Sequence, residues 1–422
     1  MRSLSWLLPG GDLRILAAYL LLCMFSLLTL WSVTEGIHGP YQGVEPDVPK
    51  SVFWRQAMWM AVSFVALAIA ARIPLRHLEN LALPVYLGAV ALLLVTLVAG
   101  TVVAGSRRWL VAGPLSVQPS ELAKVATILL LASVLGRRSG RRSLPTTLLS
   151  LLLAVVPFLL VFKEPDLGTS LVFLALWVGL VFWYGIPGVF LLWAASAAGS
   201  AILSFYSESV AQNPWPWAVF LLLLMGLLYM GRFGMLTSSI ILGTNVLTGL
   251  GIPMLWEKLR PYQQTRIMAF FDPQSDAFGS GYQAIQSQVA IGSGGLFGTH
   301  YLQGTQKGLA FLPERHTDFI FSVIGEELGF AGAVAVLALF AFLVLRAIDL
   351  AGDTRRPFAA YLAVGAASYF TFHVAVNVSI TTGLLPVTGL PLPLISYGGS
   401  NLLVSSVLVG FLLNISSRRA MS

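Results

Sequence analysis

Long apolar runs recur along almost the whole chain, separated by short segments that hold most of its charges. A bilayer core of about 30 Å requires about 20 mostly apolar residues in a helix, and twelve runs come near this length. The pattern therefore predicts an all-α polytopic membrane protein, a helical bundle of about twelve transmembrane helices. We expect these helices near residues 15–34, 54–73, 80–100, 121–136, 144–162, 168–185, 188–206, 215–231, 235–252, 319–346, 357–381 and 394–414.

The composition leads to the same class of protein. Of the 422 residues, 57% are hydrophobic and 10% are charged, against about 45–50% and about 25% in soluble domains. Water cannot be the solvent for most of such a surface. Residues 1–422 are therefore interpreted as a single transmembrane domain.

The arginines predict the orientation of the chain. Cytoplasmic loops of membrane proteins are enriched in Lys and Arg, and twelve spans place both termini on one side. With both termini in the cytoplasm, the inner loops carry many arginines and few acids, so the net charge of +7 is an orientation signal. Nucleic-acid binding is disfavoured because the arginines are scattered over short loops instead of forming one patch. The inner arginines are Arg2, Arg14, Arg72, Arg76, Arg137, Arg138, Arg141, Arg142, Arg232, Arg346, Arg355, Arg356, Arg418 and Arg419.

The largest loop on the outer side comprises residues 253–318. A loop of this length is usually functional or disordered, and its aromatic and apolar content argues against disorder. Within it, residues 282–291 predict a short helix along the membrane surface, and the glycine-rich run 292–298 lets the backbone turn or approach a ligand closely. Its candidate binding cations are Lys258, Arg260 and Lys307.

Two charged pairs lie around the start of the fourth span. Glu121 and Lys124 are spaced i, i+3, which places both on one helix face. Charges within a membrane are costly, so the pair must face the protein interior or a wet cavity; a structural ion pair is the alternative to a functional one. Arg107 and Arg108 precede them outside the membrane, where a guanidinium suits a phosphate group.

A short turn at residues 163–169 joins the fifth and sixth spans on the outer side. It places the carboxylate of Asp166 just ahead of a helix. That carboxylate is a candidate functional group. The alternative is a helix N-cap, for which Asp is a favoured residue.

The segment 311–319 gathers ionisable groups at the outer mouth of the tenth span. Asp318 has the chemistry of a general base, which needs a carboxylate within hydrogen-bond reach of a substrate hydroxyl. The alternative is that Thr317 or Asp318 caps the helix that follows. The neighbouring polar candidates are Glu314, Arg315, His316 and Thr317.

The usual metal-site signatures are absent from the sequence, which has one cysteine and dispersed histidines. Asp272 and Asp276 could share a hard cation such as Mg²⁺ or Mn²⁺, although a pair of solvated loop acids is the commoner explanation. No cofactor is assigned firmly.

Five sequence words in a fixed order resemble those of the SEDS proteins (shape, elongation, division and sporulation). Within that family the chain looks more like the RodA branch of cell elongation than the FtsW branch of cell division. The words are QPSELAK at 118–124, PDLGT at 165–169, GTQ at 304–306, LPERHTDFIF at 312–321 followed by GEELG at 325–329, and PLPLISYGGS at 391–400.

The resemblance implies a peptidoglycan glycosyltransferase of the bacterial inner membrane that joins lipid II units into glycan strands during elongation and shape maintenance. It also implies a class B penicillin-binding protein, a transpeptidase, as partner, with other proteins of the elongation complex. By position, Asp318 matches the family's essential carboxylate. The other sensitive or supporting polar positions that the words cover include Glu121, Lys124, Asp166 and Ser396, and the arginines of the first outer loop match further ones.

The sequence departs from the family pattern in four places. The family usually has ten spans, and the two extra ones are predicted within residues 188–252. Glu164 replaces a common glutamine and Asn401 a common serine, while residues 298–300 replace a glycine-lysine-glycine word. None of these changes affects Asp318.

Two other functions remain open at this level. A lipid II flippase or transporter would also have many spans with polar residues at their ends, and His373 and Asn377 lie on one face of a span. A scaffold would hold the penicillin-binding protein without chemistry of its own.

Overall fold

The computed structural model describes residues 12–35, 48–103, 106–112, 115–139, 143–185, 188–258, 261–271, 280–304 and 314–419. In this part of the chain, eleven helices are long and apolar enough to cross a membrane, and α8 is a shorter apolar helix. Together they occupy all twelve predicted positions. The helices are α1 (Leu13–Thr34), α2 (Ser51–Ala70), α3 (Leu75–Ala99), α4 (Pro119–Arg137), α5 (Leu144–Lys163), α6 (Leu167–Tyr184), α7 (Gly188–Phe205), α8 (Trp215–Met230), α9 (Met235–Trp256), α10 (Pro261–Phe271), α11 (Ser280–Ser293), α13 (Ile320–Asp353), α14 (Pro357–Thr381) and α15 (Gly399–Arg419).

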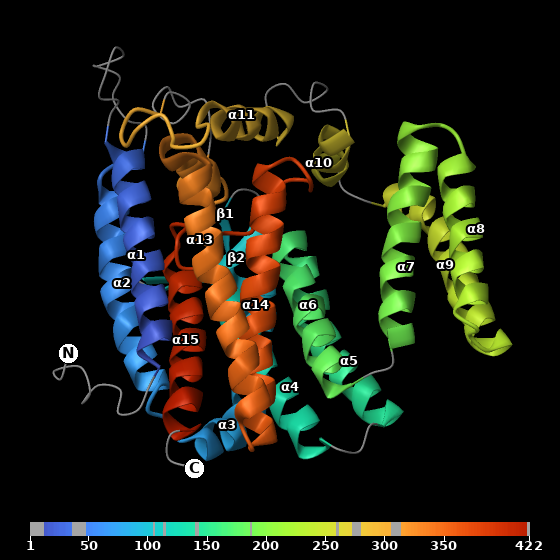
Figure 1. Cartoon of the computed structure of the whole chain (residues 1–422), viewed down its shortest axis with the longest axis horizontal. Helices are drawn as coiled ribbons and strands as arrows, with labels where there is room; N and C mark the ends of the chain where they lie inside the picture. The colour runs from blue at the N-terminus through green and yellow to red at the C-terminus, as the bar shows by residue number, and fades with distance from the viewer. Residues whose placement is uncertain are drawn as a thin grey trace. The chain divides into compact units, whose positions relative to one another are not determined.

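The chain divides into two compact units, residues 1–184 with 283–422, and residues 185–282. In the first unit, α1–α6 and α13–α15 run side by side as a bundle (Figure 1). Of the membrane-crossing segments, 83% of α4 and α15 is buried inside the protein but only 22% of α2. The central helices can therefore carry polar groups, whereas the outer ones present apolar side chains to lipid.

Polar side chains and close backbone contacts join the helices of this bundle, as expected where lipid removes the hydrophobic drive between helices. Asn414 of α15 donates to the carbonyls of Ala70 and Ile73 at 2.9 and 2.7 Å. Tyr86 of α3 donates to the carbonyl of Leu153 in α5 at 2.8 Å. These bonds tie α15 to the end of α2, and α3 to α5.

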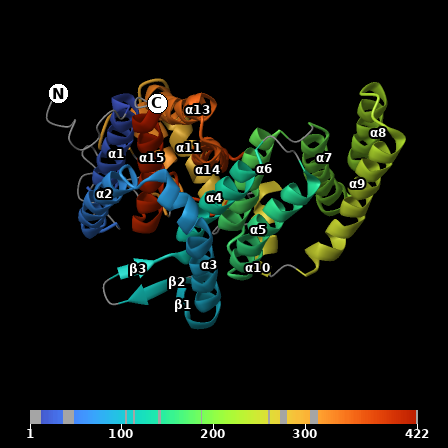
Figure 2. The same ribbon diagram turned by 90° about the horizontal axis from the view of Figure 1, so that it is seen from below.

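A small antiparallel sheet between α3 and α4 departs from the all-α prediction (Figure 2). Its strands β1 (Thr101–Val103), β2 (Ser106–Ala112) and β3 (Leu115–Val117) lie in the order β1-β2-β3. Their valines and Trp109 are residue types that strands favour, but strands this short give no long apolar signal. The sheet holds Arg107 and Arg108 on opposite faces of β2.

Helix α13 has 34 residues, about 51 Å at 1.5 Å per residue, which is longer than a membrane core requires. Gly329 interrupts it with φ 66° and ψ −164°. Next to this kink, the amides of Phe330 and Ala331 donate to the carbonyls of Gly295 and Leu296 at 2.9 and 3.0 Å. A Cβ at Gly298 would lie 2.0 Å from the Glu327 carbonyl oxygen. The glycine run therefore approaches the backbone of α13, whereas the sequence predicted a turn or an approach to a ligand.

The predicted surface helix exists as α11. Its Ser287 donates to the carbonyl of Thr381 at 2.6 Å and lies 2.6 Å from the Ser322 hydroxyl. Helix α11 therefore ties the start of α13 to the end of α14.

The second unit consists of α7, a π-helical turn (Tyr206–Val210), α8, α9 and α10. Ser200 and Ser204 of α7 donate to the carbonyls of Asn245 and Gly249 in α9 at 2.8 and 2.6 Å. Leu224, Leu228 and Ile241 form its buried cluster. These helices are thus held together by contacts of their own.

Candidate functional site

Asp318 lies in a turn, residues 314–319, directly before α13. The N-cap of α13 is Phe319, which makes no side-chain capping bond. Thr317 instead donates its hydroxyl to the Glu314 carboxylate at 3.0 Å. The alternative in which Thr317 or Asp318 caps this helix is therefore wrong, because the helix starts one residue later.

Three successive carbonyls of this turn each accept a hydrogen bond from the last part of the chain. The amide N–H of Tyr397 donates to the His316 carbonyl at 2.9 Å. The hydroxyl of Ser396 donates to the Thr317 carbonyl at 2.6 Å, and the side-chain amide of Asn377 donates to the Asp318 carbonyl at 2.9 Å. The backbone that carries Asp318 is therefore fixed from α14 and from the segment before α15.

The side chain of Asp318 lies against Gly389, in the segment between α14 and α15. It is partly exposed, and a Cβ at Gly389 would be 3.4 Å from its Oδ2. Asn377 also donates to the Leu390 carbonyl at 2.8 Å. One amide therefore fixes both the Asp318 turn and the loop that contacts its carboxylate.

The start of α6 packs on the same loop. A Cβ at Gly168 would lie 2.8 Å from the Thr388 carbonyl oxygen and 3.1 Å from Cγ of Leu390. The loop of residues 388–390 therefore contacts both the start of α6 and the side chain of Asp318.

Asp166 caps α6, as predicted by the alternative to a functional role. Its Oδ1 accepts the Thr169 amide at 3.1 Å, and its Oδ2 lies 3.6 Å from Nη1 of Arg108. Arg108 also donates to the carbonyls of Glu164, at 3.2 Å, and of Pro165. Arg108 thus holds the turn between α5 and α6.

Glu164, in the same turn, is buried with 2% of its surface exposed. Burial, followed by the charge of Asp166, raises the pKa of its carboxyl to about 8, although Arg108 acts in the opposite direction. Arg107 points to the other face of β2, is exposed, and donates to the Val98 carbonyl at 3.1 Å. Of the two arginines, Arg107 is the more accessible to a ligand.

Glu121 and Lys124 form a buried ion pair with 2.6 Å between Oε1 and Nζ. Lys124 also lies 3.3 Å from Nε2 of His373, whose Nδ1 is 3.2 Å from the Pro391 carbonyl. Since an ammonium only donates, Nε2 is the acceptor and Nδ1 carries the hydrogen. The pair thus supports the 388–396 loop through His373, and the full burial of Lys124 favours this internal role over direct contact with a substrate.

His373 and Asn377 are the features that the transporter hypothesis used. Both are fully buried, and their side chains bond to Pro391, Leu390 and Asp318. They fix loops, which favours a site at one end of the bundle over a path across it.

The remaining predicted residues are spread more widely. Arg315 is buried, Glu314 is exposed, and the His316 ring lies 5.8 Å from that of Tyr397. Lys258 is exposed in the second unit. Arg260, Lys307, Asp272 and Asp276 lie outside the described residues. Within the described ranges, no group of three His, Cys, Asp or Glu residues could hold a metal ion, so the cation site stays a prediction.

Sequence reasoning missed the supporting roles of Gly389, Tyr397 and Asn377. The signal for Asn377 was present, because His373, Asn377 and Thr381 recur every four residues in an otherwise apolar span, and polar groups in such a span must find partners. Tyr397 lies in the word at 391–400, but no local pattern indicated its bond to the His316 carbonyl or the contact of Gly389 with Asp318.

Comparison with known proteins decides the family. The model of the FtsW/RodA/SpoVE cell cycle proteins matches residues 13–217 and 217–421. The chain belongs to this family. The predicted SEDS resemblance is confirmed.

Curated relatives include members of both branches. The peptidoglycan glycosyltransferase MrdB of Escherichia coli K12 is 34% identical over 97% of this chain and 94% of its own length. RodA of Treponema pallidum is 30% identical over 97% of this chain and 98% of its own. A probable peptidoglycan glycosyltransferase FtsW of Halomonas elongata is 37% identical over 86% and 80%.

Solved structures agree with the helical membrane fold. A chain from a peptidoglycan synthase complex, described as showing structural coordination of polymerization and crosslinking, is 29% identical, with a TM-score of 0.68 over 98% of this chain and 99% of that one. RodA of Thermus thermophilus is 26% identical, with a TM-score of 0.61 over 97% and 98%.

Proposed function

We propose that this chain is a peptidoglycan glycosyltransferase that polymerises lipid II, with Asp318 as general base. The near full-length relatives bear the name of this activity. The observation that carries the role of Asp318 is its fixed backbone: the carbonyls of residues 316–318 are all bonded, while the side chain remains partly exposed. A carboxylate held in this way is positioned before substrate arrives.

The proposed reaction forms one bond and breaks one. The C4 hydroxyl oxygen of the acceptor lipid II attacks the anomeric carbon of the donor chain, and Asp318 takes the hydroxyl proton. The bond between the anomeric carbon and the diphosphate oxygen breaks, and its electron pair leaves with undecaprenyl diphosphate. Removing the proton during attack makes the oxygen a better nucleophile.

The leaving diphosphate needs positive charge nearby. Arg107 is the more accessible cation of the sheet between α3 and α4, and Lys258, Arg260 and Lys307 belong to the large loop. Arg108 and Lys124 act indirectly, through the Asp166 turn and through His373. Among the described residues, no group of three His, Cys, Asp or Glu residues could hold a metal ion beside these cations.

The proposed location is the bacterial inner membrane, with both termini cytoplasmic and Asp318 at the outer side. Support comes from the different residues at the two ends of α14. Arg355 and Arg356 precede its first residue, whereas Asn377, near its other end, bonds Asp318. The membrane therefore separates the arginine-rich end from the Asp318 end.

The proposed partner is a class B penicillin-binding protein within an elongation complex. One related chain was solved within a synthase complex that coordinates polymerization and crosslinking, so a transpeptidase is the natural companion of this chain. The relatives that match nearly the whole of it bear elongation-branch names, which supports a role in cell shape.

The activity is tested with purified protein and its cognate transpeptidase, the latter inactivated by a β-lactam. Lipid II is supplied and the products are separated as a glycan ladder. A ladder is expected. Its absence, together with transfer of lipid II between leaflets of liposomes loaded on the inner leaflet only, would support the transporter instead.

A further inference from the structure

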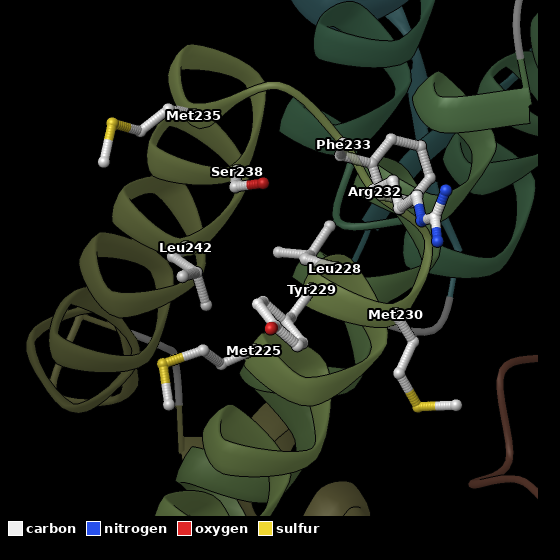
Figure 3. A pocket seen from close by; sticks show the side chains of 9 residues that line it. All are labelled: Met225, Leu228, Tyr229, Met230, Arg232, Phe233, Met235, Ser238 and Leu242. Atoms are coloured by element: carbon white, nitrogen blue, oxygen red, sulfur yellow. The ribbon is translucent and has the colours of Figure 1, made fainter.

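A cavity of about 750 Å³ lies between α8 and α9 next to the turn that joins them (Figure 3). Ligand pockets typically have about 300–1,000 Å³. Its apolar walls include Met225 and Leu228 of α8 and Met235 and Leu242 of α9, while Arg232 and Ser238 add polar groups. Methionine side chains are flexible and fill irregular spaces, which suits a ligand with a mobile apolar part.

The turn exposes its one charged residue, while the next residue is half-buried. Phe233 packs against the cluster of Leu224, Leu228 and Ile241, and its amide donates to the Leu228 carbonyl at 3.3 Å. Arg232 adopts a left-handed backbone with φ 51° and is exposed. A non-glycine residue in this conformation is strained, and the strained residue here is the one that exposes its guanidinium.

Arg232 is the only charged residue between Glu208 and Glu257, a stretch that the structure describes completely. None of the ion pairs among the described residues includes it. A guanidinium next to apolar walls at the end of a membrane hairpin complements a phosphate attached to acyl chains.

We propose that this cavity binds an anionic diacyl phospholipid. The phosphate pairs with Arg232 at the cytoplasmic interface, and an acyl chain lies along the methionines between α8 and α9. This site is independent of the glycosyltransferase chemistry.

Lipid retention tests the proposal. The full-length protein is exchanged into detergent with phosphatidylglycerol or phosphatidylcholine, and bound lipid is measured by native mass spectrometry. Arg232→Gln is expected to retain about fivefold less phosphatidylglycerol, and Ser238→Phe should reduce it by filling the cavity. The control Arg355→Gln, an exposed arginine of a short loop, should retain the wild-type amount. Equal phosphatidylglycerol retention by Arg232→Gln and wild type, or equal wild-type retention of both lipids, would overturn the proposal.

A second inference concerns Glu164 and rests on the proposed function. Both carboxyl oxygens of Glu164 are buried, and neither has a hydrogen-bond partner. The charged groups that face it are Asp166 and Arg108, and Arg108 is already committed to Asp166 and to two carbonyls of the turn. A second negative charge here would repel Asp166 and compete for Arg108.

We infer that Glu164 carries its proton in the active enzyme and is a positioning residue. In this state it leaves Arg108 to hold the turn before α6, and α6 packs against the loop beside Asp318. Ionisation would loosen that turn. Since the pKa of Glu164 is raised to about 8, the loosening falls at mildly alkaline pH.

The test is the pH profile of polymerisation. The wild type is expected to lose activity as pH rises through about 8, whereas Glu164→Gln, which cannot ionise, should keep its activity to higher pH. Glu79→Gln, at a surface ion pair with Arg137, is the control and should follow the wild type. An identical alkaline limb in wild type and Glu164→Gln would overturn the inference.

Thermal unfolding separates this inference from the glycosyltransferase itself. A carboxyl whose folded pKa is raised stabilises the fold fully below its unfolded pKa, and this contribution is lost as pH rises through the folded value. The wild-type midpoint should therefore fall relative to that of Glu164→Gln between about pH 4.5 and about 8. This readout holds even if neither protein polymerises lipid II, and parallel midpoints would overturn the inference.

Discussion

The side-chain amide of Asn377 donates to the backbone carbonyl of Asp318, with 2.9 Å between Nδ2 and the oxygen. The same amide donates to Leu390 at 2.8 Å, next to the glycine that contacts the Asp318 carboxylate. Fifty-nine residues separate Asn377 from Asp318. The backbone of the proposed catalytic residue is thus fixed by a buried amide from another helix.

Replacing Asn377 should therefore reduce turnover more than stability alone explains. Asn377→Leu removes both bonds, and a shift of about 1 Å at a reacting group can reduce the rate about 10²-fold. We expect kcat to fall by about this factor with a smaller change in KM. The measurement is initial-rate polymerisation of lipid II.

Asn414 supplies a matched control, because it is equally buried and also donates to two carbonyls, those of Ala70 and Ile73. Asn414→Leu should lower the thermal midpoint by a similar amount and leave kcat of the folded protein near the wild-type value. Equal losses of kcat in both variants would show that Asn377 acts through general stability only.

The Glu121–Lys124 pair should behave as one unit. Removing one partner of a buried ion pair typically costs about 3–5 kcal/mol, because the other charge remains buried and unpaired. Lys124→Met and Glu121→Gln should each lower the thermal midpoint strongly, and the double variant should lose less than the sum of the two. Additive losses would contradict the pairing.

How far the sequence predicts such contacts depends on their range. The Glu121–Lys124 pair was predictable because both residues lie on one helix, three positions apart. Its further partners, His373 and Asn401, come from helices whose packing no local pattern defines. The twelve apolar helices were also predictable, because the membrane sets their length and composition. The β-sheet at 101–117 and the kink at Gly329 were missed because both depend on a few residues.

In the candidate site, too, the residues could be predicted from the sequence but their long-range contacts could not. Sequence words identified Asp318, Asp166 and Ser396, but not that they converge on the 388–396 loop. The capping alternative was right for Asp166 and wrong for Asp318, because the start of a helix cannot be located to one residue from sequence. Lys307 and the two loop aspartates remain predictions.

Two glycines of the 292–298 run should differ in their tolerance of a methyl group. Gly298 has φ +84°, and its Cβ would lie 2.0 Å from the Glu327 carbonyl oxygen, whereas a Cβ at Gly292 meets nothing within 4 Å. Gly298→Ala should destabilise the protein by about 1–3 kcal/mol. Gly292→Ala should be neutral or slightly stabilising. Similar thermal midpoints for the two variants would contradict the backbone contact with α13.

The two neighbouring arginines of β2 should have different kinetic effects. Arg107→Gln removes an exposed cation and is expected to raise KM for lipid II several-fold with little change in thermal midpoint. Arg108→Gln removes the bonds that hold the Asp166 turn, so it should lower the midpoint as well. The measurement is KM and midpoint on the same preparations, and a reversed pattern would exchange the two assigned roles.

The central claim is that Asp318 is the base of a lipid II polymerase. The most direct measurement compares the glycan ladders of wild type and Asp318→Asn, each with its transpeptidase inactivated by a β-lactam and each checked for an unchanged thermal midpoint. We expect a ladder from the wild type and a rate reduced about 10²- to 10⁴-fold in the variant, the usual contribution of a general base. A folded Asp318→Asn protein that polymerises lipid II at the wild-type rate would contradict the claim.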